Sequence, residues 1–130
     1  IARIHQYIIM TAPTMAQYGA LEGLLSCEDD VQKMAAEYDR RRKFIVEGLN
    51  YIGLPTFEPR GAFYAFPKVS VTGLNDEEFS NRLLQEKHVA AVPGSAFGSG
   101  GEGFLRCSYA TAIDQIEEAL DRIDQFVKSL

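Results

Sequence analysis

Arg106 is the residue of this sequence whose neighbours most favour the binding of an anion. It stands in a short apolar segment, residues 103–109, that follows a glycine-bearing stretch at residues 92–98. In an alternating strand Arg106 shares its face with Phe104 and Ser108, and the more apolar side chains take the other face. A planar guanidinium on a rigid element suits a carboxylate or a phosphate. An edge-strand arginine in water, or a structural ion pair, is the alternative interpretation.

Three glycines near this segment match a nucleotide-binding spacing. Gly98, Gly100 and Gly103 fit the G-x-G-x-x-G pattern of dinucleotide-binding loops. That loop works between a strand and a helix whose N-terminus receives the phosphates. The residues after Gly103 predict a strand instead, so the spacing does not indicate a nucleotide site. No glycine-lysine-Ser/Thr sequence is present, which excludes a Walker loop in this chain.

Metal and thiol chemistry have little support in the sequence. His5 and His88 are isolated, with no second ligand at metal-binding spacing. Cys27 and Cys107 are far apart and form no C-x-x-C pattern, which predicts reduced thiols in a cytoplasmic protein. Cys107 has no visible histidine partner, so a cysteine nucleophile is not indicated.

The composition narrows the class of partner. The 130 residues are 46% hydrophobic and 24% charged, which is typical of one folded domain. The net charge of -5 argues against nucleic acid or an acidic membrane as a partner. No apolar run is long enough to span a bilayer. We therefore expect a cytoplasmic protein that binds neither nucleic acid nor a membrane.

Several elements must position these residues, and the first of them are helices. Apolar residues at helical spacing predict one helix over residues 1–10, interrupted at Pro13, and a second over residues 14–26. Thr14 and Gln17 have the spacing of a capping box for the second helix.

A third and longer helix is predicted to start at Ser26 as its cap and to end at Gly53. Residues 40–43 on this helix are all basic. Four consecutive residues spread around a helix, so we expect a solvated, ion-paired face rather than a binding patch.

The second half of the chain predicts short strands. Aromatic-rich runs at residues 55–58 and 62–67 surround the turn at 59–61 and predict a hairpin or a sharp corner. Residues 89–92 predict a short buried strand, and residues 103–109 another.

Two further helices separate and follow these strands. Asn75 with Glu78 predicts the start of one, and Thr111 with Asp114 the start of the last. Strands and helices together predict one α+β domain, a small sheet covered by helices.

Four segments of this sequence occur in the same order and at similar separations in one family. They are residues 38–42 (Tyr-Asp-Arg-Arg-Arg), 59–64 (Pro-Arg-Gly-Ala-Phe-Tyr), 92–98 (Val-Pro-Gly-Ser-Ala-Phe-Gly) and 105–110 (Leu-Arg-Cys-Ser-Tyr-Ala). Along essentially its full length the chain resembles the C-terminal part of a class I/II, fold type I, pyridoxal-phosphate-dependent aminotransferase of the aspartate aminotransferase-like branch. The resemblance implies a small, mostly antiparallel sheet covered by helices, one of them long.

The resemblance also implies roles for particular residues. Arg106 matches the arginine that binds the α-carboxylate of the substrate, which agrees with the interpretation of its strand. Gly61 and Phe63 match a small-domain segment that borders the substrate pocket. Residues 11–14 match a region near the dimer interface and the neighbouring active site.

Other parts of the family pattern are missing from this chain. The family uses pyridoxal 5'-phosphate, held as a Schiff base by a lysine that follows a serine-rich motif upstream of the matched region. No lysine here stands in such a motif, whether Lys33, Lys43, Lys68, Lys87 or Lys128. We therefore expect residues 1–130 to be the small domain, with about residues 1–26 being the tail of a large domain, and to be inactive alone.

The resemblance implies that the full-length protein is a homodimer that moves an amino group between an amino acid and a 2-oxo acid. Three alternatives stay open. The first is another fold type I enzyme, a lyase or a synthase. The second is an aminotransferase-like sensor domain of a transcription regulator, and the third is a free-standing carboxylate-binding or dimerisation domain.

Overall fold

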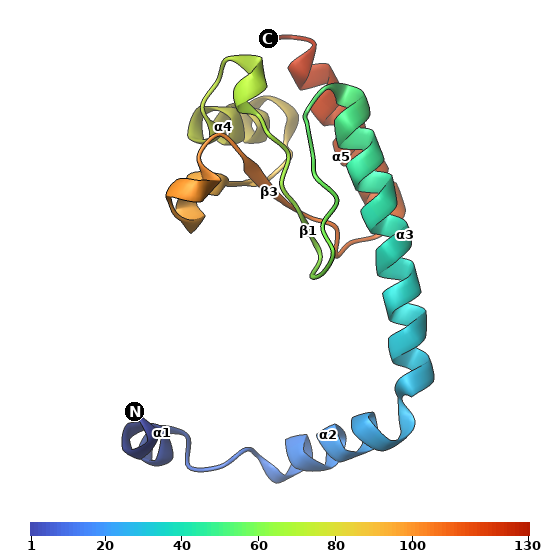
Figure 1. Cartoon of the computed structure of the whole chain (residues 1–130), viewed down its shortest axis with the longest axis vertical. Coiled ribbons are helices and arrows are strands. Elements are labelled where there is room, and N and C mark those ends of the chain that lie inside the picture. The colour runs from blue at the N-terminus through green and yellow to red at the C-terminus, as the bar shows by residue number, and fades with distance from the viewer. The chain divides into compact units, whose positions relative to one another are not determined.

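The structure is a computed structural model that describes residues 1–130, and it divides into two compact units, Ile1–Ala36 and Glu37–Leu130. The first unit holds the helices α1 (Ala2–Ile9) and α2 (Thr14–Ser26), together with the first residues of α3 (Glu28–Ile52). Figure 1 shows the course of these helices along the chain. No helix of the structure combines the length and the apolar character that crossing a membrane requires.

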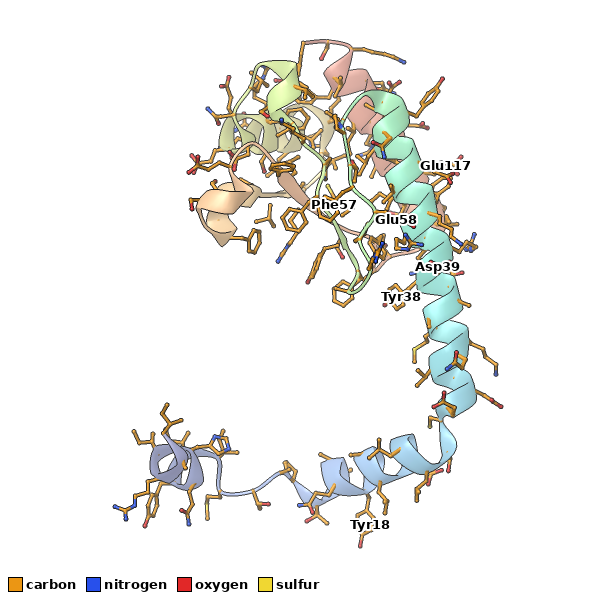
Figure 2. All side chains as sticks on the ribbon, in the orientation of Figure 1. Tyr18, Tyr38, Asp39, Phe57, Glu58 and Glu117 are labelled. Carbon is orange, nitrogen blue, oxygen red and sulfur yellow. The ribbon has the colours of Figure 1, made fainter.

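The helices α1 and α2 contain no buried residue. Their apolar side chains are exposed, among them Ile4, Tyr7, Ile8, Met15, Tyr18, Leu21, Leu24 and Leu25. Figure 2 shows Tyr18 projecting from α2. The first unit therefore does not build a hydrophobic core of its own.

The start of α2 corrects the predicted capping box. Thr14 is the first helical residue, and Pro13 takes the N-cap position without a side-chain cap. The proline ring fixes φ, and its backbone (φ -54°, ψ 141°) already has the extended geometry of a cap residue. Gln17 donates its side-chain amide to the Ala12 carbonyl at 2.7 Å instead.

The second unit is the predicted α+β fold. The elements after α3 are β1 (Tyr64–Ala65), α4 (Asp76–Lys87), β2 (Val92–Pro93), β3 (Leu105–Ser108) and α5 (Ile113–Val127), with short 3-10 turns at Ser70–Thr72, Gly94–Phe97 and Ser99–Gly101. The sheet has the order β1-β3-β2, and both pairings are antiparallel. Thr56 and Pro67 form an isolated antiparallel bridge, which confirms that the chain turns back between them.

The core of this unit lies between one face of the sheet and its helices. Leu49, Phe79, Phe126, Leu105 and Tyr109 are each at most 1% exposed. The rings of Phe79 on α4 and Phe126 on α5 meet edge to face with centroids 5.0 Å apart. These contacts fix the helices against the central strand, β3.

The helices α3 and α5 lie against each other in the second unit (Figure 1). A Cβ added at Gly48 on α3 would come within 2.5 Å of the Leu120 side chain on α5. The two helices therefore approach closely at this position, and a larger residue there would require the Leu120 side chain to move.

Four other predicted boundaries were tested by the structure. Asn75 caps α4, its side chain accepting from the Glu78 amide at 2.8 Å, and Gly53 follows α3 with φ 94°, so both predictions are confirmed. The predicted caps Ser26 and Thr111 are wrong, because Ser26 is the last residue of α2 and Ala112 precedes α5 without a side-chain cap. Local side-chain chemistry marks a candidate cap, but the backbone path into the helix decides its position.

The strand predicted over residues 89–92 is also displaced, because β2 covers only Val92–Pro93. Val92 pairs with Arg106 and Pro93 with Leu105. The Ala91 carbonyl accepts a hydrogen bond from the Ser80 hydroxyl of α4 at 2.6 Å, so this residue is held by the helix rather than by the sheet.

The basic run at residues 40–43 forms the predicted ion-paired face. Arg40 and Arg41 both bond Glu37, and together they lower the pKa of that carboxyl to about 2. Arg42 bonds Asp39 on its own helix and Glu58 on the following segment. Figure 2 shows Asp39 on α3 and Glu58 on the adjacent loop. The run therefore joins the loop to α3.

Candidate functional site

Arg106 lies at the centre of the sheet, because β3 has a partner strand on each side. The predicted alternation is confirmed: Leu105 and Tyr109 are 1% exposed, whereas Arg106 is half-buried on the other face. Cys107 packs against the core, and burial raises the pKa of its thiol to about 12. The thiol is therefore no nucleophile at neutral pH.

Two aromatic rings enclose the Arg106 guanidinium. Its Cζ atom lies 4.5 Å from the ring centroid of Tyr64 and 4.4 Å from that of Phe97. Tyr64 comes from β1, where it pairs with Ser108 and so stands diagonally beside Arg106. Phe97 ends the 3-10 turn that follows β2. Both distances are within the range of cation–π attraction.

Arg106 has no acidic partner within the chain. Other arginines are paired with a carboxylate, namely Arg40, Arg41, Arg42, Arg82 and Arg122. Arg106 makes neither an ion pair nor a side-chain hydrogen bond, and its side-chain contacts are with rings. Arg3 and Arg60 also lack an acidic partner, but both are exposed rather than half-buried in the sheet. The guanidinium donors of Arg106 are thus free to bind a planar anion.

A buried carboxylate holds the loop that carries Phe97. Asp76, at the start of α4, is 5% exposed and accepts hydrogen bonds from the Ser95 amide at 2.8 Å and the Gly103 amide at 3.2 Å. Burial raises the pKa of this carboxyl, but hydrogen bonds from the Ser95 side chain and from the two amides outweigh burial and hold the pKa below its ordinary value. Residues 94–103 form one loop, called the glycine-bearing loop below. Asp76 ties Ser95 and Gly103, near its two ends, to α4.

Two glycines close the same loop. A Cβ at Gly94 would lie 2.1 Å from the Gly101 carbonyl oxygen, and one at Gly101 would lie 2.0 Å from that of Gly94. The Gly94 amide also bonds the Phe104 carbonyl at 2.8 Å. A strand, β3, follows this loop, as predicted, so the G-x-G-x-x-G spacing does not lead into a helix.

Phe63 and Gly61 occupy the segment before β1. The Phe63 ring lies 4.6 Å from that of Tyr64 and 6.2 Å from that of Tyr38 on α3, so it reaches Arg106 through Tyr64. Gly61 is exposed, and the space where a side chain would stand is open. The left-handed residue of this turn is Ala62, with φ 58°. Phe63 therefore contacts Tyr64, one of the two rings at Arg106, and the role expected of Phe63 and Gly61 stays a prediction.

An open hollow of about 380 Å³ adjoins the site. Its walls are glycine and phenylalanine: Phe57, Phe66, Phe97, Phe104, Gly100 and Gly101. Phe97 belongs to both the hollow and the pair of rings around Arg106. A positive charge thus stands beside an apolar surface, an arrangement suited to a carboxylate that carries an apolar group.

Sequence reasoning did not find Tyr64, Phe97 or Asp76 as parts of the site. The aromatic residues were available as a signal, because Tyr64 and Arg106 both fall in short strands that alternate. The sequence did not give the register that brings them together. Asp76 gave no signal beyond an acidic residue in the first turn of a helix.

Three of the five lysines are held in ion pairs on helices, and Lys68 is exposed. Lys33 pairs with Asp30, Lys43 with Asp39 and Lys128 with Asp124, each on its own helix. No lysine lines the aromatic hollow. His88 ends α4 in a left-handed conformation, with φ 57°.

Comparisons with known proteins place these features in context. The family model described as aminotransferase class I and II matches residues 2–123. The YugH protein of Bacillus subtilis is 54% identical over 125 residues, which cover 96% of this chain and 32% of the relative. An aspartate aminotransferase of Pyrococcus abyssi is 45% identical over 130 residues, 98% of this chain and 33% of the relative.

A solved structure, an aromatic aminotransferase from Pyrococcus horikoshii, matches with a TM-score of 0.93 and 45% identity, over 98% of this chain and 34% of that one. The chain thus spans about a third of the length of the relatives it matches.

Proposed function

This chain belongs to the class I and II aminotransferase family, and we propose that it is the part of a longer aminotransferase that grips the substrate. The proposed reaction moves an amino group between an amino acid and a 2-oxo acid, with pyridoxal phosphate as the cofactor that the family implies. In this proposal Arg106 binds the α-carboxylate shared by both substrates. The observation that carries it is a half-buried guanidinium with free donors on the central strand.

The proposal assigns residues 27–130 to a small domain and residues 1–26 to the tail of a large domain. The hydrophobic core supports this division, because its members run from Ile45 to Phe126. The helices α1 and α2 bury nothing and carry many exposed apolar side chains. Such a surface is expected where a larger body, or the second subunit of a homodimer, covers it.

The residues of this chain do not by themselves fit pyridoxal phosphate. A Schiff-base lysine needs an amine set in a pocket, but Lys33, Lys43 and Lys128 are ion-paired on helix surfaces. No lysine or histidine lines the hollow beside Arg106. We therefore assign proton transfer to residues outside this chain, and substrate binding and orientation to Arg106.

The bound carboxylate would accept two parallel hydrogen bonds from the edge of the guanidinium. A charge-assisted contact of this kind, shielded from bulk water, contributes about 1.5–3 kcal/mol to the free energy of substrate binding. Because the fork is planar, it also fixes the direction from which the α-carbon leaves the carboxylate. Arg106 would then both select carboxylates and orient the amino group for reaction.

The test is the substitution Arg106→Ala in the full-length enzyme, with L-aspartate and L-tyrosine as trial substrates. We expect kcat/KM to fall roughly 10- to 150-fold, which corresponds to the loss of about 1.5–3 kcal/mol of binding. Transamination of tyramine, which is tyrosine without its α-carboxylate, is expected to be unchanged by the substitution.

The matched control is Arg40→Ala, which removes an exposed arginine paired with Glu37 on α3. That variant is expected to keep the parent kcat/KM for both substrates. If Arg106→Ala also keeps it, or loses activity equally on amino acid and amine, Arg106 does not bind the carboxylate.

A further inference from the structure

Arg106 is supported differently from the other half-buried arginines, each of which is paired with a carboxylate. Arg42 is held by Asp39 at 2.7 Å and by Glu58, so its charge is neutralised inside the protein. Arg106 is held by the faces of two rings. Rings attract a cation through their quadrupole without carrying a charge, so the cation stays available to an incoming anion.

The two rings also restrict the orientation of the guanidinium. Tyr64 and Phe97 each lie about 4.5 Å from the Cζ atom and so cover part of the guanidinium, while its N–H edge makes no hydrogen bond within the chain. That edge is the side that presents parallel donors to a carboxylate. An arginine without such support loses more side-chain rotamer entropy when it binds, so prior ordering favours binding.

Other aromatic residues hold the two rings themselves. Phe97 meets Phe66 edge to face with centroids 6.2 Å apart. Tyr64 meets Phe63, and Phe63 stacks on Tyr38 at 6.2 Å and 30°. Tyr38 stands on α3, which Figure 2 shows running beside the loop. The rings around Arg106 are therefore anchored on one side to a long helix and on the other to the sheet.

We propose that Tyr64 and Phe97 are positioning residues that clamp the Arg106 guanidinium between their faces and present its edge, already oriented and not neutralised, to the substrate carboxylate. This inference rests on the proposed function of Arg106. It adds that the aromatic character of residues 64 and 97, and not only their bulk, determines the affinity for carboxylates.

The experiment compares Tyr64→Leu and Phe97→Leu with the ring-preserving variants Tyr64→Phe and Phe97→Tyr, all in the full-length enzyme. Each leucine variant is expected to raise KM for the amino acid and the Kd of propionate, a simple carboxylate probe, by roughly 2- to 30-fold, the range of one cation–π contact. We expect kcat to change less than KM. The ring-preserving variants are expected to stay near the parent values.

A second arm tests whether the rings act through the arginine. In an Arg106→Ala background, Tyr64→Leu is expected to cause no further loss of propionate affinity, because the group that it positions is gone. The amine lacking a carboxylate is expected to react equally well with and without the leucine substitutions.

The outcomes separate the two proposals. If Arg106→Ala has no effect on carboxylate binding, the function proposed for Arg106 fails. If Arg106→Ala weakens binding but the leucine variants do not, or if their losses add fully to that of Arg106→Ala, the clamp is overturned while the function stands. Equal losses on carboxylate and amine substrates would show that the rings serve only folding.

Discussion

At the scale of single residues, Asp76 shows how one buried acid orders a binding loop. Its two oxygens accept amides from Ser95 and Gly103, which lie at opposite ends of the glycine-bearing loop. These two bonds add to the pairing of β2 with β3, which holds Pro93 opposite Leu105 just outside the loop. Because Phe97 lies inside this loop, the position of a ring at Arg106 depends on a carboxylate some distance away in the sequence.

We predict that Asp76→Asn destabilises the 130-residue chain by about 1–3 kcal/mol, since an amide replaces one charged acceptor. The folded pKa of Asp76 lies below its ordinary value. The stability that the ionised Asp76 carboxylate gives to the folded state is therefore complete above about pH 5. It is lost as the pH falls below about 4 and the carboxylate becomes protonated. Urea unfolding between pH 3 and pH 7 measures this.

The quantity to compare is the unfolding free energy of the parent minus that of the variant at each pH. The pH dependence from the other carboxylates is the same in both proteins and cancels in this difference. The difference should be largest at pH 7 and shrink toward pH 3. A difference that is constant with pH would contradict the role given to the charge of Asp76.

At the scale of elements, two backbone segments of the glycine-bearing loop pack directly against each other. Gly94 and Gly101 approach each other so closely that neither position has room for a Cβ. Gly94 is buried, and the residues on either side of it, Pro93 and Ser95, are half-buried. The turn that carries Phe97 can fold back on β3 only because these side chains are absent.

We predict that Gly94→Ala lowers the free energy of unfolding by roughly 3 kcal/mol or prevents folding, because its Cβ would meet the Gly101 carbonyl. Gly100→Ala is the matched control in the same loop. Gly100 has open space at the Cβ position and no left-handed backbone, so its change should stay within about 0.5 kcal/mol. The measurement is urea unfolding of both variants. Equal losses of unfolding free energy in the two variants would contradict the close approach of Gly94 and Gly101.

At the scale of the whole molecule, Arg106 and the two rings around it belong to one of the two compact units. The compact unit Glu37–Leu130 holds the core, the sheet and Arg106. No lysine lines the aromatic hollow to which Phe97 belongs. Arg106 thus stands among aromatic side chains, whereas Lys33, Lys43 and Lys128 are ion-paired on helices.

We predict that the 130-residue chain, titrated with pyridoxal phosphate and reduced with borohydride, is labelled weakly at several lysines. Exposed amines such as Lys33 and Lys128 react without selection because nothing around them favours the cofactor. Peptide mapping of the modified lysines provides the measurement. Saturable labelling of a single lysine, with an absorbance band that responds to amino acids, would overturn the division of labour proposed here.

The sequence alone was enough to predict features that depend on local chemistry. Alternation in β3 put Arg106 on the face away from the core, as the structure confirms. The Asn75 cap and the glycine after α3 follow from the backbone needs of helix ends, and both are confirmed. The pairing of the basic run with Glu37 and Asp39 follows from helical spacing.

Only the tertiary structure decided what surrounds Arg106. Tyr64 reaches it because β1 and β3 pair in one register, and Phe97 reaches it because a loop closes on Asp76. Register and loop closure are set by packing between segments far apart in the sequence, so no local pattern encodes them. The same reason explains the misplaced caps at Ser26 and Thr111, where the path of the backbone outweighed the side chain.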